Sequence, residues 1–340
     1  MSLLACRRAI VGIAGTVLSA GEQAILAAMP PVGVILFARN VEDRRQLRAL
    51  TDELRAVTGK PDMLLLVDQE GGRVMRLRPP HWRGLPPMAA IGALHDAEPT
   101  RGNRAAWLVG RLIAHDLREV GIDVACAPVL DLWLEETTKA IGDRSFGGDV
   151  ARVVALGRAL RLGLEAGGVQ GVVKHLPGHG RARADSHLEL PVVTAGLDEL
   201  RSTDFACFAG HGDAPLGMTC HVVYKAVDDA RPATLSPVVI GDVIRGQIGF
   251  RGILMSDDLD MGALSGPKAE RAELALAAGC DLAVVCRGDL RELTEVLAIT
   301  PPVDGALAGR LRGLELVRGN PLPAAIATLE TELADLLKVA

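Results

Sequence analysis

Eight short runs of apolar residues recur along the chain, and each is apolar at successive positions rather than at alternate ones. Such runs are typical of parallel strands that are covered on both faces of a sheet. They comprise Ile10–Ala14, Gly33–Ala38, Met63–Val67, Val124–Val129, Val169–Val173, Leu216–Cys220, Gly252–Met255 and Asp281–Cys286.

Segments with helical periodicity lie between these runs. In Glu42–Thr58, Leu47, Leu50 and Leu54 recur at three- and four-residue spacing, which places them on one helix face. An alternation of strands and helices predicts an α/β fold with a parallel sheet. The further predicted helices are Gly102–Val120, Val150–Ala166, Leu197–Ala209, Pro237–Gln247 and Pro267–Ala278.

Polar residues, most of them ionisable, follow nearly every predicted strand. In a closed barrel the carboxyl ends of all strands meet at one mouth, where enzymes of this architecture carry out their chemistry. In an open sheet the same residues would be spread along an edge. We therefore predict a single (β/α)8 TIM-type barrel, with an open doubly wound sheet as the alternative. The residues are Arg39-Asn40, Asp68, Asp131, Lys174-His175, His221, Asp257 and Arg287.

No linker or internal repeat divides the sequence, so we predict a single domain over residues 1–340. Pro301-Pro302 marks a break after the last barrel helix. The tail beyond it predicts two amphipathic helices, Asp304–Val317 and Ala324–Val339, which we expect to pack on the outside of the barrel.

The beginning of the chain has two interpretations. Arg7-Arg8 and the apolar stretch after it have the pattern of a short signal peptide. The same residues predict the strand Ile10–Ala14 and a helix from Ser19, where Ser19 and Glu22 form a capping box. We favour the strand and helix.

The composition narrows the functional classes. The 340 residues carry 37 Lys and Arg against 42 Asp and Glu, a net charge of −5, and no basic cluster, so we expect no nucleic-acid partner. The sequence contains no uninterrupted run of about 18 apolar residues, the length that a membrane helix requires, so we predict no membrane helix. The six cysteines lie scattered in the sequence, several of them inside apolar runs, as is typical of reduced, buried thiols. We expect a cytoplasmic protein and a monomer.

The densest group of ionisable residues follows the fifth predicted strand. Lys174–Gly180 and Asp185–His187 together hold a lysine, an aspartate and three histidines, and Gly and Pro residues there prevent a regular helix or strand. We interpret the group as a metal-free acid/base loop. A metal site is the alternative, because His175, His179, Asp185 and His187 are all ligand types, although their spacing matches no common metal motif.

Asp257 and Asp258 follow the seventh predicted strand. If regular strand geometry continues to this point, neighbouring side chains point in opposite directions. We then expect one carboxylate to face the mouth of the barrel and the other to cap the next helix or pair with a cation. Capping by both carboxylates is the alternative.

The acid/base loop, together with further segments, resembles the signature of the β-N-acetylglucosaminidases of glycoside hydrolase family 3, the cytoplasmic bacterial type. The resemblance runs from about residue 10 to about residue 290 in the family's order. It implies a barrel that removes terminal N-acetylglucosamine, without a cofactor, from N-acetylglucosaminyl-1,6-anhydro-N-acetylmuramic acid, with or without stem peptide, in peptidoglycan recycling. The matching segments are Gly33–Phe37 with Arg39-Asn40, Asp68–Val74, Ala127–Asp131, Ile141–Phe146, Lys174–Gly180, Asp185–His187 with Pro191, Pro232–Thr234 and Ser256–Leu259.

The resemblance also implies roles for single residues. Asp257 would be the nucleophile, His187 the general acid/base and Asp185 its partner, whose charge favours the imidazolium that protonates the departing oxygen. The residues implied in sugar binding are Asp68, Arg76, Arg144, Lys174 and His175.

Three positions depart from the family's pattern. Leu176 stands where Phe is common, Asp260 where a small residue is frequent, and Arg287 where Asn is usual. We expect Arg287 to alter the preference for the leaving group or the peptide.

Three other functions stay open. A metal-dependent barrel hydrolase would use His175, His179 and Asp257, and would lose activity on chelation. A sugar-binding barrel would bind N-acetylglucosamine without turnover. Phosphate could also replace water as the acceptor, because a neutral His tolerates an anionic acceptor better than a carboxylate does.

Overall fold

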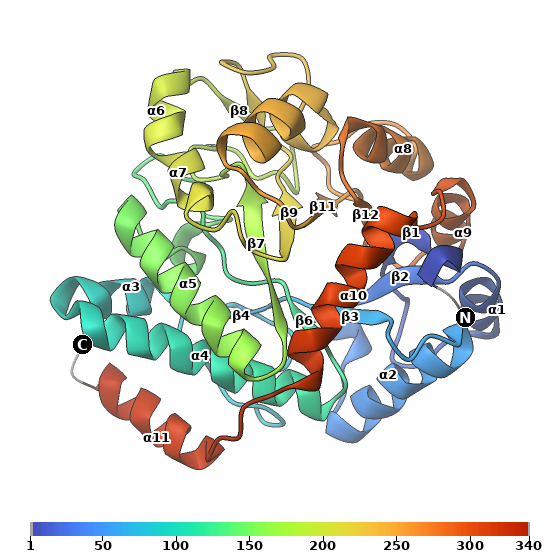
Figure 1. Cartoon of the computed structure of the whole chain (residues 1–340), viewed down its shortest axis with the longest axis horizontal. Coiled ribbons are helices and arrows are strands. Elements are labelled where there is room, and N and C mark those ends of the chain that lie inside the picture. Colours follow the sequence, from blue (N-terminus) through green and yellow to red (C-terminus); the bar gives the residue numbers. More distant parts are fainter. Residues whose placement is uncertain (1–2, 339–340) are drawn as a thin grey trace.

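Eight parallel strands close into a barrel in the order β1-β12-β11-β9-β7-β6-β3-β2 (Figure 1). The computed structural model describes residues 3 to 338, with the side chains of all of these except 316 and 317. The closed barrel confirms the predicted fold class and excludes the open sheet. The strands are β1 Arg7–Val11, β2 Pro31–Leu36, β3 Leu64–Val67, β6 Val124–Ala125, β7 Gln170–Leu176, β9 Leu216–Thr219, β11 Ile253–Asp258 and β12 Leu282–Val285.

Each predicted strand contains or overlaps an observed one. β1 and β2 begin three and two residues before the predicted strands, and the differences that concern the site lie at the carboxyl ends. β6 stops at Ala125, because the Ala127 N–H donates back to the Ala125 carbonyl at 2.8 Å instead of continuing the ladder. β7 and β11 extend three residues beyond their apolar runs, to Leu176 and Asp258. Their polar ends therefore belong to the strands themselves.

Two small sheets that the sequence did not predict stand beside the barrel. β4 (Gln69–Gly71) and β5 (Val74–Met75) form an antiparallel hairpin directly after β3. β8 (Val192–Val193) and β10 (Val223–Tyr224) pair in parallel and join the segments that follow β7 and β9.

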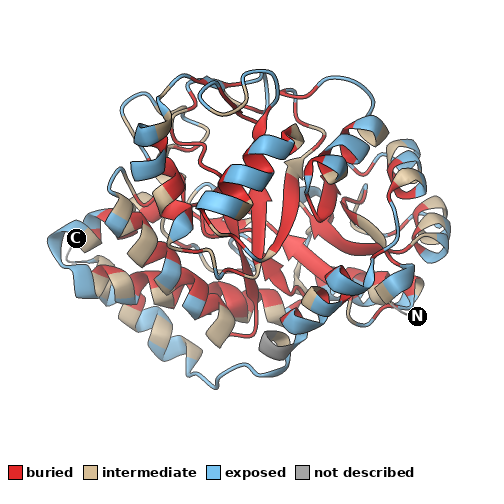
Figure 2. Cartoon of the chain, turned by 45° about the horizontal axis from the view of Figure 1, so that its top comes forward, coloured by how far each residue is buried: buried red, intermediate tan, exposed pale blue. Residues whose placement is uncertain are grey.

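The helices surround the strands, with buried faces inward and exposed faces outward (Figure 2). The Ser19 capping box is formed and begins the first helix, as predicted. The helix expected at Leu197–Ala209 breaks at Thr203, and the sequence analysis missed the helix at 88–97. The helices are α1 Ala20–Ala28, α2 Arg44–Thr58, α3 Met88–Ala97, α4 Pro99–Glu119, α5 Val150–Ala166, α6 Leu197–Ser202, α7 Asp204–Ala209, the π-helix η5 Val239–Gln247, α8 Lys268–Ala278 and α9 Leu290–Ile299. Single 3-10 turns are η1 Leu3–Ala5, η2 Ala38–Asn40, η3 Gly142–Arg144 and η4 Ala233–Leu235.

The two tail helices differ in their position. α11 (Ile326–Leu337) contacts α4 on the outside of the barrel, as predicted; the predicted end at Val339 lies outside the described residues. α10 (Gly305–Gly319) instead lies across the strands (Figure 1). Leu307, Leu311 and Leu314 join the apolar cluster inside the barrel. The outside packing expected for α10 is therefore wrong, because its apolar side closes the amino end of the barrel.

The six cysteines are free and buried. No helix in the described part of the chain is long and apolar enough to cross a membrane.

Candidate active site

A cavity of about 1040 Å³ opens at the carboxyl ends of the barrel strands. Barrel closure brings these ends together although they are far apart in the sequence. All eight residues singled out from the sequence line this cavity, and their roles remain predictions. They are Asp68, Arg76, Arg144, Lys174, His175, Asp185, His187 and Asp257.

Lys174 lies between two carboxylates at the floor of the cavity. Its Nζ is 3.0 Å from an oxygen of Asp68 and 2.7 Å from an oxygen of Glu70. Asp68 also accepts a hydrogen bond from Arg76 at 2.9 Å. Burial alone would raise the pKa of Asp68, but Lys174 and Arg76 outweigh it and hold that pKa far below its ordinary value. Asp68 is therefore an anion throughout the physiological range.

Arg144 is held by Glu70. Its Nε donates to Oε2 of Glu70 and its Nη2 donates to Oε1, both at 2.8 Å, so the two side chains form a bidentate pair. The sequence analysis missed Glu70 as a site residue. Its spacing of two from Asp68 was the available signal, because alternate residues of an extended segment point to the same side.

Asp131 fixes His175. Its Oδ2 lies 2.6 Å from Nδ1 of His175, and its Oδ1 accepts the backbone N–H of His179 at 2.6 Å. Asp131 is fully buried, but its interaction with the His175 ring and the hydrogen bond from the His179 N–H outweigh the effect of burial and lower its pKa. With Nδ1 engaged, Nε2 is the nitrogen of His175 that a ligand can use.

Asp257 lies near the end of β11. Burial would raise its pKa, but His175, His221, the N–H of Asp258 and Lys174 together hold the pKa below the ordinary value. The Asp258 N–H donates to the Asp257 carboxylate at 2.8 Å. Asp257 is therefore an ionised carboxylate that the cavity exposes to a ligand.

Asp258 also lines the cavity, and this corrects the expectation that only one of the two neighbouring carboxylates would do so. The register of β11 against β12 shifts between Met255 and Asp258, so the regular alternation of side chains is lost there. Asp258 accepts the backbone N–H groups of Asp260 at 2.9 Å and Cys286 at 3.2 Å, but it forms no ion pair with a cation of the described residues. Burial, followed by the charges of Asp260 and Asp257, raises the pKa of Asp258 to about 7.

Asp185 and His187 come from the loop between β7 and β8. The His187 Nδ1 lies 2.7 Å from Oδ1 of Asp185, which also accepts the His187 backbone N–H at 2.9 Å. These hydrogen bonds and the neighbouring imidazole outweigh burial and lower the pKa of Asp185. The His187 side chain is 65% exposed, so its ring is free to meet a ligand in the cavity.

His179 is the third histidine of this segment, besides His175 and His187. Its Nε2 is 3.0 Å from the Ser186 hydroxyl, and its Nδ1 has no hydrogen-bond partner in the structure. Burial lowers the pKa of His179 to about 4, so its ring is neutral at pH 7. The sequence placed His179 in the acid/base loop, with a metal ligand as the alternative; in the structure it contacts Ser186, next to His187.

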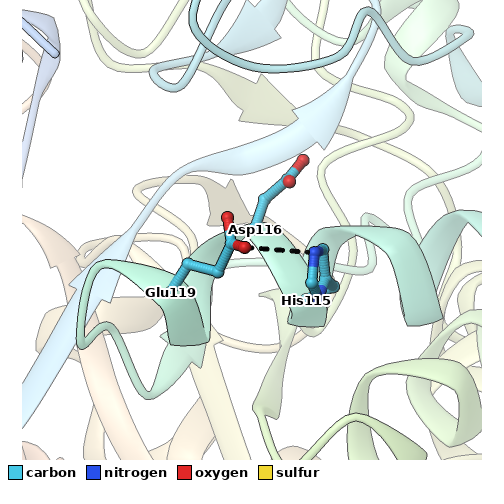
Figure 3. Close-up of side chains that lie close together, drawn as sticks. All are labelled: His115, Asp116 and Glu119. Carbon is cyan, nitrogen blue, oxygen red and sulfur yellow. Dashed lines mark ion pairs between the residues drawn. The ribbon is translucent and has the colours of Figure 1, made fainter. Parts of the chain in front are cut away.

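One group of potential metal ligands is present among residues 3–338: His115, Asp116 and Glu119 on α4 (Figure 3). Arg83 donates to both oxygens of Asp116, at 2.8 and 3.0 Å, and Arg44 pairs with Glu119. Both carboxylates thus already form ion pairs with arginines. The four side chains considered as metal ligands in the sequence, His175, His179, Asp185 and His187, do not form a comparably close group in the described structure.

Two groups at the mouth of the barrel have the chemistry that cleavage of a glycosidic bond requires. One is a half-buried, ionised carboxylate, and the other is an imidazole oriented by a second carboxylate. Together with the buried cations and acids that suit sugar hydroxyls, they assign the protein to the barrel glycosidases.

Comparison with known proteins gives the particular family. Residues 13–301 match the N-terminal domain of glycosyl hydrolase family 3, and the chain belongs to this family, as the sequence resemblance predicted. A β-hexosaminidase of Bordetella avium is 42% identical over 307 residues, which cover 88% of this chain and 87% of the relative. One of Chromobacterium violaceum is 43% identical over 307 residues, covering 89% and 85%.

A solved structure is similar over nearly the whole chain. NagZ from Neisseria gonorrhoeae, in complex with N-trifluoroacetyl-D-glucosamine, superimposes with a TM-score of 0.87 at 35% sequence identity, covering 99% of each chain. A family 3 β-N-acetylglucosaminidase from a Paenibacillus strain superimposes with a TM-score of 0.85 at 29% identity and covers 99% of this chain and 68% of that one.

Proposed function

We propose that the protein is a retaining exo-β-N-acetylglucosaminidase in which Asp257 is the nucleophile and His187 the general acid/base. The observation that carries the proposal is the ionised Asp257 and the Asp185–His187 pair on the walls of one cavity. The β-hexosaminidases among its relatives and the N-acylglucosamine derivative bound to the similar NagZ support an N-acetylhexosamine as the sugar.

The reaction has two steps. Asp257 attacks the anomeric carbon and forms a glycosyl ester, while the protonated His187 gives its proton to the departing oxygen. The neutral His187 then takes a proton from water, which attacks the anomeric carbon and releases Asp257. Asp185 supports both steps, because its charge stabilises the imidazolium and its oxygen fixes the ring through Nδ1.

The floor of the cavity is suited to hold the sugar. Lys174, Arg76 and Arg144 offer N–H donors, and Asp68 and Glu70 offer acceptors, in fixed positions set by their ion pairs. His175 offers the nitrogen that Asp131 leaves available. A closed floor with these groups suits a terminal sugar rather than an internal one.

We assign the substrate to peptidoglycan fragments, N-acetylglucosaminyl-1,6-anhydro-N-acetylmuramic acid with or without its stem peptide. The support is the family resemblance along the sequence and the similarity to NagZ. The leaving sugar would extend out of the open side of the cavity toward the exposed His187.

The test is release of p-nitrophenol from its β-N-acetylglucosaminide by the wild type and Asp257→Ala, with a chelator present throughout. We expect activity in the wild type and loss of nearly all of it in the variant, because no other group replaces the nucleophile. His187→Ala should lose about 10²–10⁴-fold on a disaccharide and less on the aryl glycoside, whose leaving group needs little protonation.

Two results would contradict the proposal. Loss of wild-type activity on chelation would favour the metal-dependent alternative. Tight binding of N-acetylglucosamine without any turnover would indicate a binding protein.

A further inference from the structure

The loop that carries Asp185 and His187 is held by the loop that follows the Asp257 strand. Residues 178–191 contain no helix or strand. In the middle of this segment, the Gly262 N–H donates to the His187 carbonyl at 3.1 Å, and the Ala263 N–H donates to the Ser186 carbonyl at 3.1 Å. Two adjacent backbone hydrogen bonds thus join the loop of the proposed acid/base to that of the proposed nucleophile.

The close approach at Gly262 depends on the absence of a side chain. A Cβ atom there would lie 2.8 Å from the His187 carbonyl oxygen and 2.9 Å from that of Leu188. The φ angle of Gly262 lies outside the left-handed region, so its backbone conformation does not itself require glycine. Contact with the neighbouring loop is therefore the structural reason for a glycine at this position.

The loop of Gly262 is itself firmly attached to α8. The buried guanidinium of Arg271 donates to the carbonyl oxygens of Leu259 at 2.6 Å, Met261 at 3.2 Å and Gly266 at 3.0 Å. Lys268 donates to the carbonyl of Asp260 at 3.2 Å. The His187 ring, in contrast, is mostly exposed and is held through its Nδ1 by Asp185.

We propose that the Gly262 and Ala263 amides form a latch that holds His187 in its working position, and that Gly262 is a positioning residue. The inference rests on the proposed acid/base role of His187. Gly262→Ala should displace the His187 loop, because the three atoms nearest to the added methyl all belong to that loop. It should leave the sugar-binding floor unchanged, since that floor belongs to other segments.

Limited proteolysis tests the latch without any reliance on catalysis. Arg183 lies exposed in the loop, and trypsin reaches its peptide bond when the loop opens. We expect cleavage of the Arg183–Ala184 bond, followed by mass spectrometry, to be about tenfold faster or more in Gly262→Ala. The matched control is Gly241→Ala, because a Cβ at Gly241 meets nothing within 4 Å.

Kinetics test whether the latch positions His187. We expect Gly262→Ala to lose about 10–100-fold in kcat/KM on an N-acetylglucosaminyl disaccharide and several-fold less on the p-nitrophenyl glycoside. The inhibition constant of free N-acetylglucosamine should not change. Gly241→Ala should match the wild type in all three measurements.

The outcomes distinguish a failure of the latch from a failure of the proposed function. Unchanged cleavage at Arg183 overturns the latch, and faster cleavage with wild-type kinetics overturns the positioning role of Gly262. Equal losses on both substrates together with weaker inhibition would show general damage and would also overturn it. If His187→Ala, measured in parallel, behaves as the wild type, the acid/base assignment itself fails, whereas the cleavage result still reports on the latch.

Discussion

Lys174 is a buried cation that the structure neutralises from two sides. Asp68 and Glu70 lie on the same extended segment, and Arg76 and Arg144 complete an alternating set of charges. Each charge of this set is stable in the interior only because its partners are present. The set therefore fixes the positions of the donors and acceptors for the sugar before any ligand arrives.

Glu70→Gln should destabilise the protein by about 3–5 kcal/mol, because it removes the buried counter-charge of Arg144 and one of the two counter-charges of Lys174. The measurement is the free energy of unfolding from denaturant titration. Asp143→Asn is the control: its ion pair with Arg73 is exposed, and its loss should cost less than about 1 kcal/mol. Equal effects in the two variants would contradict the importance of the buried set.

The raised pKa of Asp258 should make the free energy of unfolding depend on pH. Its pKa is about 7 in the folded protein and near 4 in the unfolded chain, so the folded state binds the proton more tightly. The stability that the protonated carboxyl contributes is complete below about pH 4 and is lost as the pH rises through about 7.

Asp258→Asn should remove this dependence, since its amide oxygen can still accept the N–H groups of Asp260 and Cys286. The measurement is the melting temperature of both proteins at pH 5 and pH 8 without ligand. Relative to the wild type, the melting temperature of the variant should be higher at pH 8 than at pH 5. A constant difference across this range would show that Asp258 is ionised in the fold.

At the scale of elements, the irregular end of β11 matters most for the site. A regular strand would turn the Asp258 side chain away from that of Asp257, but the register shifts before Asp258 and both residues line the cavity. The loop after β11 then reaches the His187 loop through Gly262. One strand end therefore supplies the proposed nucleophile, a carboxyl group of raised pKa and the support for the acid/base loop.

α10 is the element that closes the amino end of the barrel. Leu311 is 5% exposed and packs into the cluster inside the strands. Leu311→Ala should cost about 2–5 kcal/mol in the free energy of unfolding, because it leaves a cavity between the helix and the barrel. The control is Leu274→Ala on the exposed side of α8, where Leu274 is 48% exposed and a change within about 0.5 kcal/mol is expected. Equal effects in the two variants would contradict the burial of Leu311 inside the barrel.

At the scale of the whole molecule, the two ends of the barrel differ in structure and in function. The amino end is sealed by apolar side chains of α10, and the carboxyl end holds the cavity. Parallel strands make this division possible, because every strand delivers its last residue to the same end. The tail can thus stabilise the fold without approaching the site.

The sequence by itself determined the class of fold, the family and eight of the residues that line the cavity. Strands that are apolar on both faces, and an ionisable residue after nearly every one of them, are local patterns that a single chain displays. Hence Asp68, Lys174 and Asp257 could be singled out before any contact between them was known.

Only the tertiary structure decided how these residues are paired and held. The ion pairs of Glu70, the neutral state of His179 and the raised pKa of Asp258 depend on burial and on neighbours distant in the chain. The contact of Gly262 with the His187 loop depends on how two loops meet across the mouth of the barrel. Such distances are properties of the closed barrel, and a one-dimensional pattern does not contain them.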